Sequence, residues 1–468
     1  MKGKLYALLA LLAIVAMVTA CGATQAPAEP TAAPTAEQAE PTAAEAQPPA
    51  EGVKELTIMW AQWDPADYLQ QIGQEYEKQT GIKVTVIQEP WGSFYDRVAA
   101  EWAAKGSAFD MVVGDSQWLG QGATQGHYLN MTDFLVSNGI DKTVTPATLT
   151  SYGEYPAGSK QYWSYPTEGD AVGWAYRKDL FENPDEMAAF QAKYGYPLAI
   201  PETWAQLRDI AEFFTRPDSN LYGNAIYTQK DYDAITMGYE NVFFSWGADW
   251  FDPATLAVQG YVNSPEAVEA LDFYKGLYQF NPPGSSNDFY AETNNHFIAG
   301  EVAMAMNYFA FFPALSNPGT NPHAANTGFF VQPKGPTGKQ HAALGGQGLS
   351  INAYVSPERQ EAAKAFIKWF AQEDTQNLWA ELGGYTCNIN VLTSDTFKNA
   401  QPYNPAFAQT MQIVKDFWNV PVYGQLLEVT QRLLQGYAVG GEGGSAQQVM
   451  DEMATEHEKI LRDAGLIK

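Results

Sequence analysis

From about residue 55 onward, short apolar runs alternate with longer amphipathic segments along the chain. The runs ELTIMW (55–60) and IKVTVI (82–87) are rich in branched aliphatic residues and predict strands. FDMVV (109–113) is a third short apolar run of the same kind. We therefore expect three strands within the first sixty residues of this pattern.

The segments between these strands have helical periodicity. In PADYLQQIGQEYEKQTG (65–81), the apolar residues Leu69, Ile72 and Tyr76 share one face, and Gly81 is placed to end a helix. In SFYDRVAAEWAAKG (93–106), Ser93 can cap a helix whose apolar stripe is Phe94, Val98 and Trp102. Strands that alternate with helices at this spacing predict a parallel sheet with crossover helices.

Aromatic, amide and carboxylate side chains follow all three predicted strands. In open α/β sheets, ligands bind beyond the carboxyl ends of the strands, where the connections to the helices cluster. Trp60 itself fits a core position, but the recurrence after three strands indicates a rim that holds a ligand. The candidates are Gln62, Trp63 and Asp64 after the first strand, Glu89 and Trp91 after the second, and Asp115, Gln117 and Trp118 after the third.

The types of side chain at this rim indicate a sugar or a polyol. A sugar ring presents C–H groups on one face and hydroxyls around its edge, so an aromatic ring flanked by carboxylate and amide acceptors suits it. The chain has 13 Trp, 26 Tyr and 24 Phe but only 27 Lys and Arg together, which favours a neutral polyhydroxylated ligand over a phosphorylated one. We expect Asp64 and Asp115 to accept hydrogen bonds from ligand hydroxyls.

The N-terminus has the pattern of an export signal. Lys2 and Lys4 precede an apolar run over 5–18, which is short for a membrane span. The sequence VTAC that ends at Cys21 resembles the lipobox of bacterial lipoproteins, in which the cysteine is lipidated; the alternative is an ordinary signal with an incidental cysteine. We predict a signal peptide at 1–20 and a disordered Ala/Thr/Pro/Glu/Gln tether at 21–52, and no later run is apolar enough to span the membrane.

Length, charge and cysteine content limit the remaining possibilities. More than 400 residues follow the predicted tether, which is more than one hydrophobic core usually supports, so we expect two lobes. The net charge of −26 argues against nucleic acid and anionic membranes as partners. Beyond Cys21, the only cysteine is Cys387, which excludes an intramolecular disulfide after lipidation; we interpret it as buried rather than reactive.

Several segments, in order along the chain, resemble the extracellular solute-binding proteins of ABC importers, in particular the maltose-binding-protein-like group. They are TGIKVTV, FDMVVGDSQWLGQGATQGHYLNMTDFL, YPTEGDAVGWAYRKDLFE, PETWAQLRDIAEFF, FIAGEVAMAMNYF and GGQGLSINAYVSPERQEAAKAFIKWFA. The third departs from the family in having Arg177 where asparagine is common. Agreement in order over the whole length is more specific than any one segment.

The resemblance implies a two-lobed α/β fold, the type II periplasmic-binding-protein fold, in which each lobe is a mostly parallel sheet flanked by helices. We expect the first lobe to comprise 53–168 and 343–382 and the second 169–342 and 383–468. The chain is expected to cross between the lobes near 166–171, 339–344 and 380–386. Ligand binding would then close the lobes about this hinge.

The resemblance also implies further residues in the cleft. From the hinge and the second lobe, these are Asp170, Glu240, Trp246, Tyr308, Tyr385 and Tyr423. Gly345, Gly346 and Gly348 permit close backbone approach around Gln347, and the resemblance implies that a first-lobe strand begins there. The aromatic at Tyr308 would stack on the ligand, and core packing is the alternative for this side chain.

We therefore predict an exported, lipid-anchored, monomeric binding protein on the outer face of the bacterial cytoplasmic membrane that delivers a sugar or polyol to an ABC permease. We expect no cofactor, metal or catalysis, because the five histidines are scattered and no hydrolase, metalloprotease or phosphate-loop motif occurs. Three alternatives stay open: a different small solute such as an amine, sensing without a permease, and a secreted glycoside-active enzyme, which would require paired acids.

Overall fold

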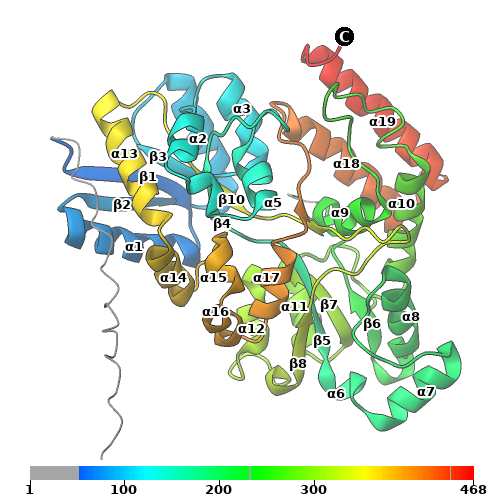
Figure 1. Ribbon diagram of the computed structural model, residues 1–468. Coiled ribbons are helices and arrows are strands. Elements are labelled where there is room, and N and C mark those ends of the chain that lie inside the picture. The colour runs from blue at the N-terminus through cyan, green and yellow to red at the C-terminus, as the bar shows by residue number, and fades with distance from the viewer. Residues whose placement is uncertain (1–51, 231–232, 443) are drawn as a thin grey trace, which may run out of the picture. The chain divides into compact units, whose positions relative to one another are not determined.

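The computed structural model describes residues 52–230, 233–442 and 444–468 (Figure 1). These residues belong to one compact unit, Ala46–Lys468. The predicted signal peptide, Cys21 and the predicted tether up to residue 51 lie outside the described residues, so the lipid anchor remains a prediction.

The first sheet has five strands in the order β2-β1-β3-β10-β4. The strands are β1 (Glu55–Ala61), β2 (Lys83–Glu89), β3 (Met111–Asp115), β4 (Tyr165–Glu168) and β10 (Gln347–Ile351). β1 pairs in parallel with both β2 and β3, as the sequence pattern predicts, whereas β10 runs antiparallel to both β3 and β4. The carboxyl ends of β1, β2 and β3 therefore lie at one edge of this sheet.

The two crossover helices of this sheet follow the predicted apolar stripes. α1 (Asp64–Thr80) buries Leu69, Ile72 and Tyr76 and ends at Gly81, whose φ of 76° is left-handed. α2 (Trp91–Ala104) buries Phe94, Val98 and Trp102. The predicted cap at Ser93 is wrong, because the helix begins two residues earlier and the Ser93 hydroxyl instead donates to Glu89 at 2.7 Å.

The second sheet has four strands in the order β6-β7-β5-β8. They are β5 (Val172–Arg177), β6 (Tyr222–Ala225), β7 (Val302–Tyr308) and β8 (Thr327–Phe330). Only the β6–β7 pair is parallel; β5 is antiparallel to β7 and to β8. The expectation of a mostly parallel sheet therefore does not describe this sheet, because β5, which the chain enters from β4 of the first sheet, runs antiparallel to both of its neighbours.

Three segments of the chain run together between the two sheets. The 169–171 segment joins β4 to β5, and Ala171 forms an isolated bridge with Leu344 just before β10. The second segment contains β9 (Ala342–Ala343) and Leu344. The third contains β11 (Val414–Lys415), which pairs in parallel with β9. The expected crossings near 166–171 and 339–344 correspond to two of these segments, and the lobe limits given above remain predictions.

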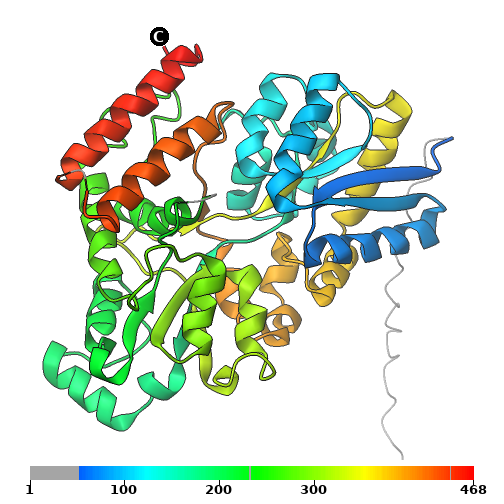
Figure 2. The same ribbon diagram turned by 180° about the vertical axis from the view of Figure 1, so that it is seen from behind.

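Helices surround both sheets (Figures 1 and 2). The remaining helices of the first half are α3 (Leu119–Thr124), α4 (Thr132–Ser137), α5 (Pro146–Thr148), α6 (Lys178–Phe181), α7 (Pro184–Tyr194), α8 (Trp204–Phe214) and α9 (Ala234–Trp246). Those of the second half are α10 (Pro265–Tyr278), α11 (Tyr290–Ile298), α12 (Phe312–Ser316), α13 (Pro357–Phe370), α14 (Glu373–Leu382), α15 (Ile389–Thr393), α16 (Asp395–Ala400), α17 (Asn404–Thr410), α18 (Tyr423–Ala438) and α19 (Ala446–Asp463). In both views α18 and α19 lie side by side near α10.

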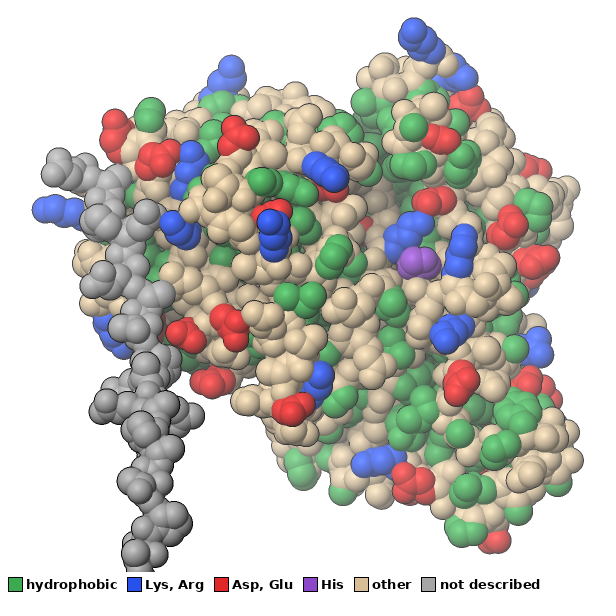
Figure 3. Space-filling model, viewed as in Figure 1, with side chains coloured by type: hydrophobic (Ala, Val, Ile, Leu, Met, Phe, Trp, Pro, Cys, Tyr) green, Lys and Arg blue, Asp and Glu red, His purple; other side chains and the backbone are tan. Residues whose placement is uncertain are grey.

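The buried apolar residues form two clusters, one centred on each sheet. Trp60 is fully buried in the first cluster, as expected for a core position. Cys387 is also fully buried, which confirms its interpretation as a packed side chain. On the face shown in Figure 3, acidic and basic side chains are interspersed. In the described part of the chain, no helix combines the length and apolarity that a membrane crossing requires.

The start of α8 offers a test of local helix stabilisation. Thr203 is the N-cap: its hydroxyl accepts from the Gln206 amide N–H at 3.3 Å, and the Gln206 side chain accepts from the Thr203 N–H at 3.2 Å. We expect Thr203→Ala to lower the free energy of unfolding by about 1 kcal/mol, because one N–H of the first turn loses its partner. Thr203→Ser keeps the cap and should restore most of it. Denaturant unfolding measures both, and equal losses in the two variants would contradict the cap assignment.

Candidate ligand-binding site

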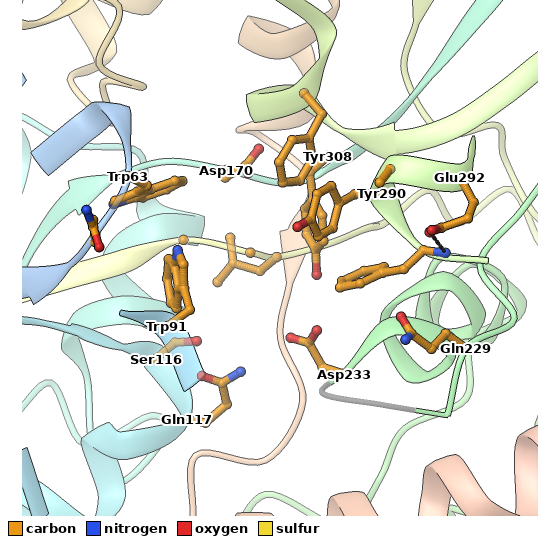
Figure 4. A pocket seen from close by; sticks show the side chains of 17 residues that line it. Trp63, Trp91, Ser116, Gln117, Asp170, Gln229, Asp233, Tyr290, Glu292 and Tyr308 are labelled. Carbon is orange, nitrogen blue, oxygen red and sulfur yellow. Dashed lines mark hydrogen bonds between the residues drawn. The ribbon is translucent and has the colours of Figure 1, made fainter. Parts of the chain in front are cut away.

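A cavity of about 640 Å³ lies where the carboxyl ends of the first sheet face the second sheet (Figure 4). Its volume is in the range of small-molecule sites. Seventeen described residues line it, and none of them is basic: Gln62, Trp63, Trp91, Ser116, Gln117, Asp170, Gln229, Asp233, Phe289, Tyr290, Ala291, Glu292, Tyr308, Phe311, Leu344, Gly345 and Gly346.

Two tryptophans form an aromatic corner on the first-sheet side. Trp63 lies at the N-cap position of α1, after β1, and Trp91 is the first residue of α2, after β2. Their ring centroids are 5.4 Å apart in an edge-to-face arrangement, and Trp60 contacts the other side of Trp63 at 5.6 Å. Both cavity tryptophans are half-buried, and the buried Trp63 Nε1 has no hydrogen-bond partner among the described residues.

The end of β3 contributes the polar part of this wall. Ser116 and Gln117 lie on a short 3₁₀ turn, Ser116–Trp118, and both are buried yet line the cavity. Behind them, the Gln347 side chain joins two strands: its Oε1 accepts from Trp60 Nε1 at 2.5 Å, and its Nε2 donates to Asp115. This buried linkage fixes the position of the turn that carries Gln117.

The segments between the sheets approach the cavity through glycines. A Cβ at Gly345 would lie 2.4 Å from the Tyr308 ring, and a Cβ at Gly346 would lie 1.9 Å from the Tyr152 hydroxyl, so neither position can take a side chain without rearrangement. Asp170 lies beside them, where its Oδ1 accepts from the Ala171 amide at 2.8 Å. Burial raises the pKa of Asp170 to about 8, and backbone N–H donors oppose that rise.

Aromatic side chains form the opposite wall. Tyr308 ends β7, Phe311 follows on a 3₁₀ turn, and Tyr290 begins α11. The Tyr290 and Phe311 rings stack with centroids 4.2 Å apart, and Tyr290 is 41% exposed. Phe289 adds a fourth ring, 6.4 Å from Tyr308. A flat ligand that enters from the tryptophan corner would therefore meet rings on both sides (Figure 4).

One acidic side chain projects into the cavity opposite Gln117. Asp233 lies just before α9 and is only 6% exposed. Burial, and then the charge of Asp115, raise the pKa of Asp233 to about 8. Asp416, on the segment after β11, is close enough to interact with it, and burial raises the Asp416 pKa to about 7. The charge of Asp115 therefore contributes to the raised pKa of both Asp233 and Asp416.

Six of the fourteen residues predicted to bind ligand line the cavity: Gln62, Trp63, Trp91, Gln117, Asp170 and Tyr308. Four others surround it from behind or from the rim. Asp115 and Gln347 bond to each other, as described above, while Trp118 is buried and donates from Nε1 to the Tyr423 hydroxyl at 3.1 Å. The ligand role of each of these residues remains a prediction.

The other four predicted residues lie away from the cavity lining. Asp64 is exposed in the first turn of α1, where its negative charge interacts favourably with the helix dipole. Glu240 is fully buried and accepts from Trp250 Nε1 at 2.6 Å. Trp246 packs 4.6 Å from Phe273, and the Tyr385 hydroxyl donates to the Phe309 carbonyl at 3.0 Å. Their contacts are those of core and helix-start residues.

The sequence pattern does not single out several lining residues. Asp233, Gln229, Phe289, Tyr290 and Glu292 lie on loops and helix starts whose sequences carry no motif. A partial signal exists for Phe311, which belongs to an aromatic cluster larger than a strand end requires, and for Gly345 and Gly346, whose pairing indicates close backbone approach. Among the described residues, no three His, Cys, Asp or Glu side chains are arranged to hold a metal ion.

Comparison with known proteins gives a consistent result. A model of the bacterial extracellular solute-binding protein family matches residues 62–377. A Deinococcus radiodurans protein described as a probable ABC transporter-binding protein is 27% identical over 330 residues, which cover 68% of this chain and 72% of the relative.

Solved structures share the fold at lower sequence identity. A solute-binding protein of an ABC transporter from Agrobacterium radiobacter, in complex with ribitol, superposes with a TM-score of 0.71 at 24% identity and covers 88% of this chain and 100% of its own. Maltose-bound MalE3 of T. maritima superposes with a TM-score of 0.70 at 23% identity and covers 87% and 100%. The fold is therefore the predicted type II periplasmic-binding-protein fold.

Proposed function

Because the chain belongs to the bacterial extracellular solute-binding protein family, whose members serve ABC transporters, we propose that it captures a sugar or polyol in the cavity described above. The observation that carries this proposal is the composition of the cavity: aromatic rings on two opposed walls, with amide, hydroxyl and carboxyl groups between them. Rings take the C–H faces of such a ligand, and the polar groups take its hydroxyls.

Each part of the cavity has a stated role in this proposal. Trp63 and Trp91 pack against one face of the ligand and Tyr308 against the other. Gln117 and Asp233 accept or donate hydrogen bonds at the ligand edge. Ribitol and maltose are the ligands of two proteins that share this fold, which supports the same ligand class here.

The proposal includes a conformational step. Ligand that contacts residues beyond both sheets would favour the closed arrangement, because it gains contacts there that the open arrangement lacks. The segments at 169–171, 342–346 and 414–415 connect the sheets and would bend. The closed protein would then dock on the permease and release the ligand.

Export and anchoring complete the proposed function. The N-terminal signal and Cys21 would place a monomeric protein on the outer face of the cytoplasmic membrane through a lipid. The tether would let the folded part reach the permease; at about 3.1 Å per residue in an extended chain, a segment of this length spans tens of ångströms.

A melting-temperature screen of the purified protein tests the ligand class. We expect at least one of a panel of ribitol, D-mannitol, maltose and common monosaccharides to raise the melting temperature at millimolar concentration, because a ligand that binds only the folded state stabilises it by mass action. At one hundred times the Kd, the gain is about 2.7 kcal/mol. The same screen includes amino acids as controls. A rise with amino acids alone would contradict the sugar or polyol assignment and leave the family assignment intact.

A further inference from the structure

The wall of the cavity around Asp233 has an excess of acceptors that a neutral ligand does not explain. Asp233 is only 6% exposed and projects into the cavity (Figure 4). Its Oδ1 has no hydrogen-bond partner among the described residues. A buried carboxyl oxygen without a partner is costly, so its occurrence in a ligand cavity indicates that a ligand group satisfies it.

Charge distinguishes the two groups that could satisfy this oxygen. A hydroxyl offers one donor and no charge, whereas an ammonium offers three donors and a positive charge. The described lining holds three acids, Asp170, Asp233 and Glu292, and no Lys, Arg or His. The charges of Asp115 and Asp416 disfavour the ionised form of Asp233. A cation next to Asp233 offsets that repulsion, and a hydroxyl does not.

The neighbouring surface also suits a cation. Asp416, which is close enough to raise the pKa of Asp233, adds a further carboxyl group next to this wall, so the excess of acceptors extends beyond one side chain. The rings of Phe289, Tyr290 and Tyr308 line the same side of the cavity. Aromatic faces attract ammonium groups electrostatically. Acids and rings together, with no basic residue in the described lining, therefore describe a site for a protonated amine.

We propose that the ligand carries a protonated amine that binds Asp233, so that the solute is an amino sugar or amino polyol rather than a neutral one. The rest of the ligand occupies the space between Trp63 and Tyr308, as in the proposed function on which this inference rests. Asp233 thus determines specificity: it selects the amine over a hydroxyl at one position of the ligand.

Matched ligand pairs test this inference by calorimetric titration of the purified protein. The pairs are D-glucosamine, D-galactosamine and D-mannosamine, each beside its neutral parent and its N-acetyl derivative, and 1-amino-1-deoxy-D-sorbitol beside D-sorbitol. We expect at least one amine to bind about tenfold or more tightly than its neutral parent, equivalent to about 1.4 kcal/mol. The N-acetyl derivative should lose this advantage, because acetylation removes the charge.

The variant Asp233→Asn separates charge from shape. Asparagine has the same size and still bonds to a hydroxyl but carries no charge, so the preference for the amine over its neutral parent should fall to near one, whatever the change in absolute affinity. Asp218→Asn, at an exposed position of the second-sheet region, is the matched control and should leave the preference unchanged. The melting temperature of each unliganded variant confirms that it is folded.

The outcomes distinguish the two proposals. Equal or tighter binding of the neutral partner overturns the amine inference and leaves the proposed function standing. Binding of a simple diamine, putrescine, without binding of any sugar or polyol, amino sugars included, overturns the sugar or polyol assignment and the inference that rests on it. A preference for the amine that survives Asp233→Asn overturns the role of Asp233. No binding by any probe overturns both proposals.

Discussion

Trp60→Ala is expected to lower the free energy of unfolding by about 3–5 kcal/mol, the largest single-residue effect on stability considered for this chain. The side chain is fully buried and stacks 6.4 Å from Trp379. Its removal leaves a cavity in the first core and deprives the buried Gln347 of the donor at 2.5 Å. Denaturant unfolding measures the loss.

A second variant separates packing from hydrogen bonding at the same position. Trp60→Phe keeps much of the ring but leaves Gln347 Oε1 without its donor, so we expect a smaller loss of about 1–3 kcal/mol. Losses of less than 1 kcal/mol in both variants would contradict the assignment of Trp60 to the core.

Trp63→Ala is expected to weaken ligand binding by about 2 kcal/mol, or roughly thirtyfold in Kd, with a smaller effect on stability. The estimate corresponds to about 80 Å² of aromatic surface that the ligand no longer covers, at about 25 cal/mol per Å². Trp63 is half-buried and lines the cavity, so its core contacts are fewer than those of Trp60. Calorimetric titration with the ligand identified in the melting screen measures the change.

Trp163→Ala is a matched control for this experiment. Trp163 is also half-buried, and its Nε1 donates to the Tyr155 carbonyl at 2.9 Å, but it does not line the cavity. We expect this variant to lose stability and keep its affinity. If both variants weaken binding equally, the effect of Trp63 is a general one on the fold and the cavity assignment is wrong.

The contrast between Trp60 and Trp63 shows what can be predicted from the sequence. Alternation of apolar runs and helical stripes predicts β1, β2, β3 and the crossover helices. Burial of one helix face requires apolar residues at helical spacing, and burial of both sheet faces requires short continuous apolar runs. The carboxyl-end rule then places Trp63, Trp91 and Gln117 at the cavity. Trp60, only three residues before Trp63, is correctly expected in the core because it lies within the strand.

The second-sheet side of the cavity was much harder to predict. Its residues lie on loops and helix starts, where no periodicity marks which side chain faces inward, so Asp233 and Tyr290 carry no signal in one sequence. Glu240 and Trp246 are assigned to the cleft by resemblance, yet both lie within the buried helix α9. Resemblance carries over the position of a segment more accurately than the direction in which a side chain points.

The antiparallel pairing of β5 could not be predicted from the sequence either. β5 is buried along almost its whole length, so it lacks the alternation of apolar and polar residues that marks an antiparallel strand with one solvated face. Its pairing with β7 and β8 is decided by contacts far along the chain. The glycines at 345 and 346 are a partial exception, since close backbone approach is the physical reason for their occurrence.

Calorimetric titration tests most directly whether the aromatic cavity binds a sugar or polyol. The wild type and Trp63→Ala are each titrated with the ligand that raises the melting temperature most. We expect one ligand per chain with a Kd near micromolar, equivalent to about 8 kcal/mol, and roughly thirtyfold weaker binding by the variant. Identical affinities for the two proteins, or no saturable heat with any sugar or polyol, amine-bearing ones included, would contradict this expectation.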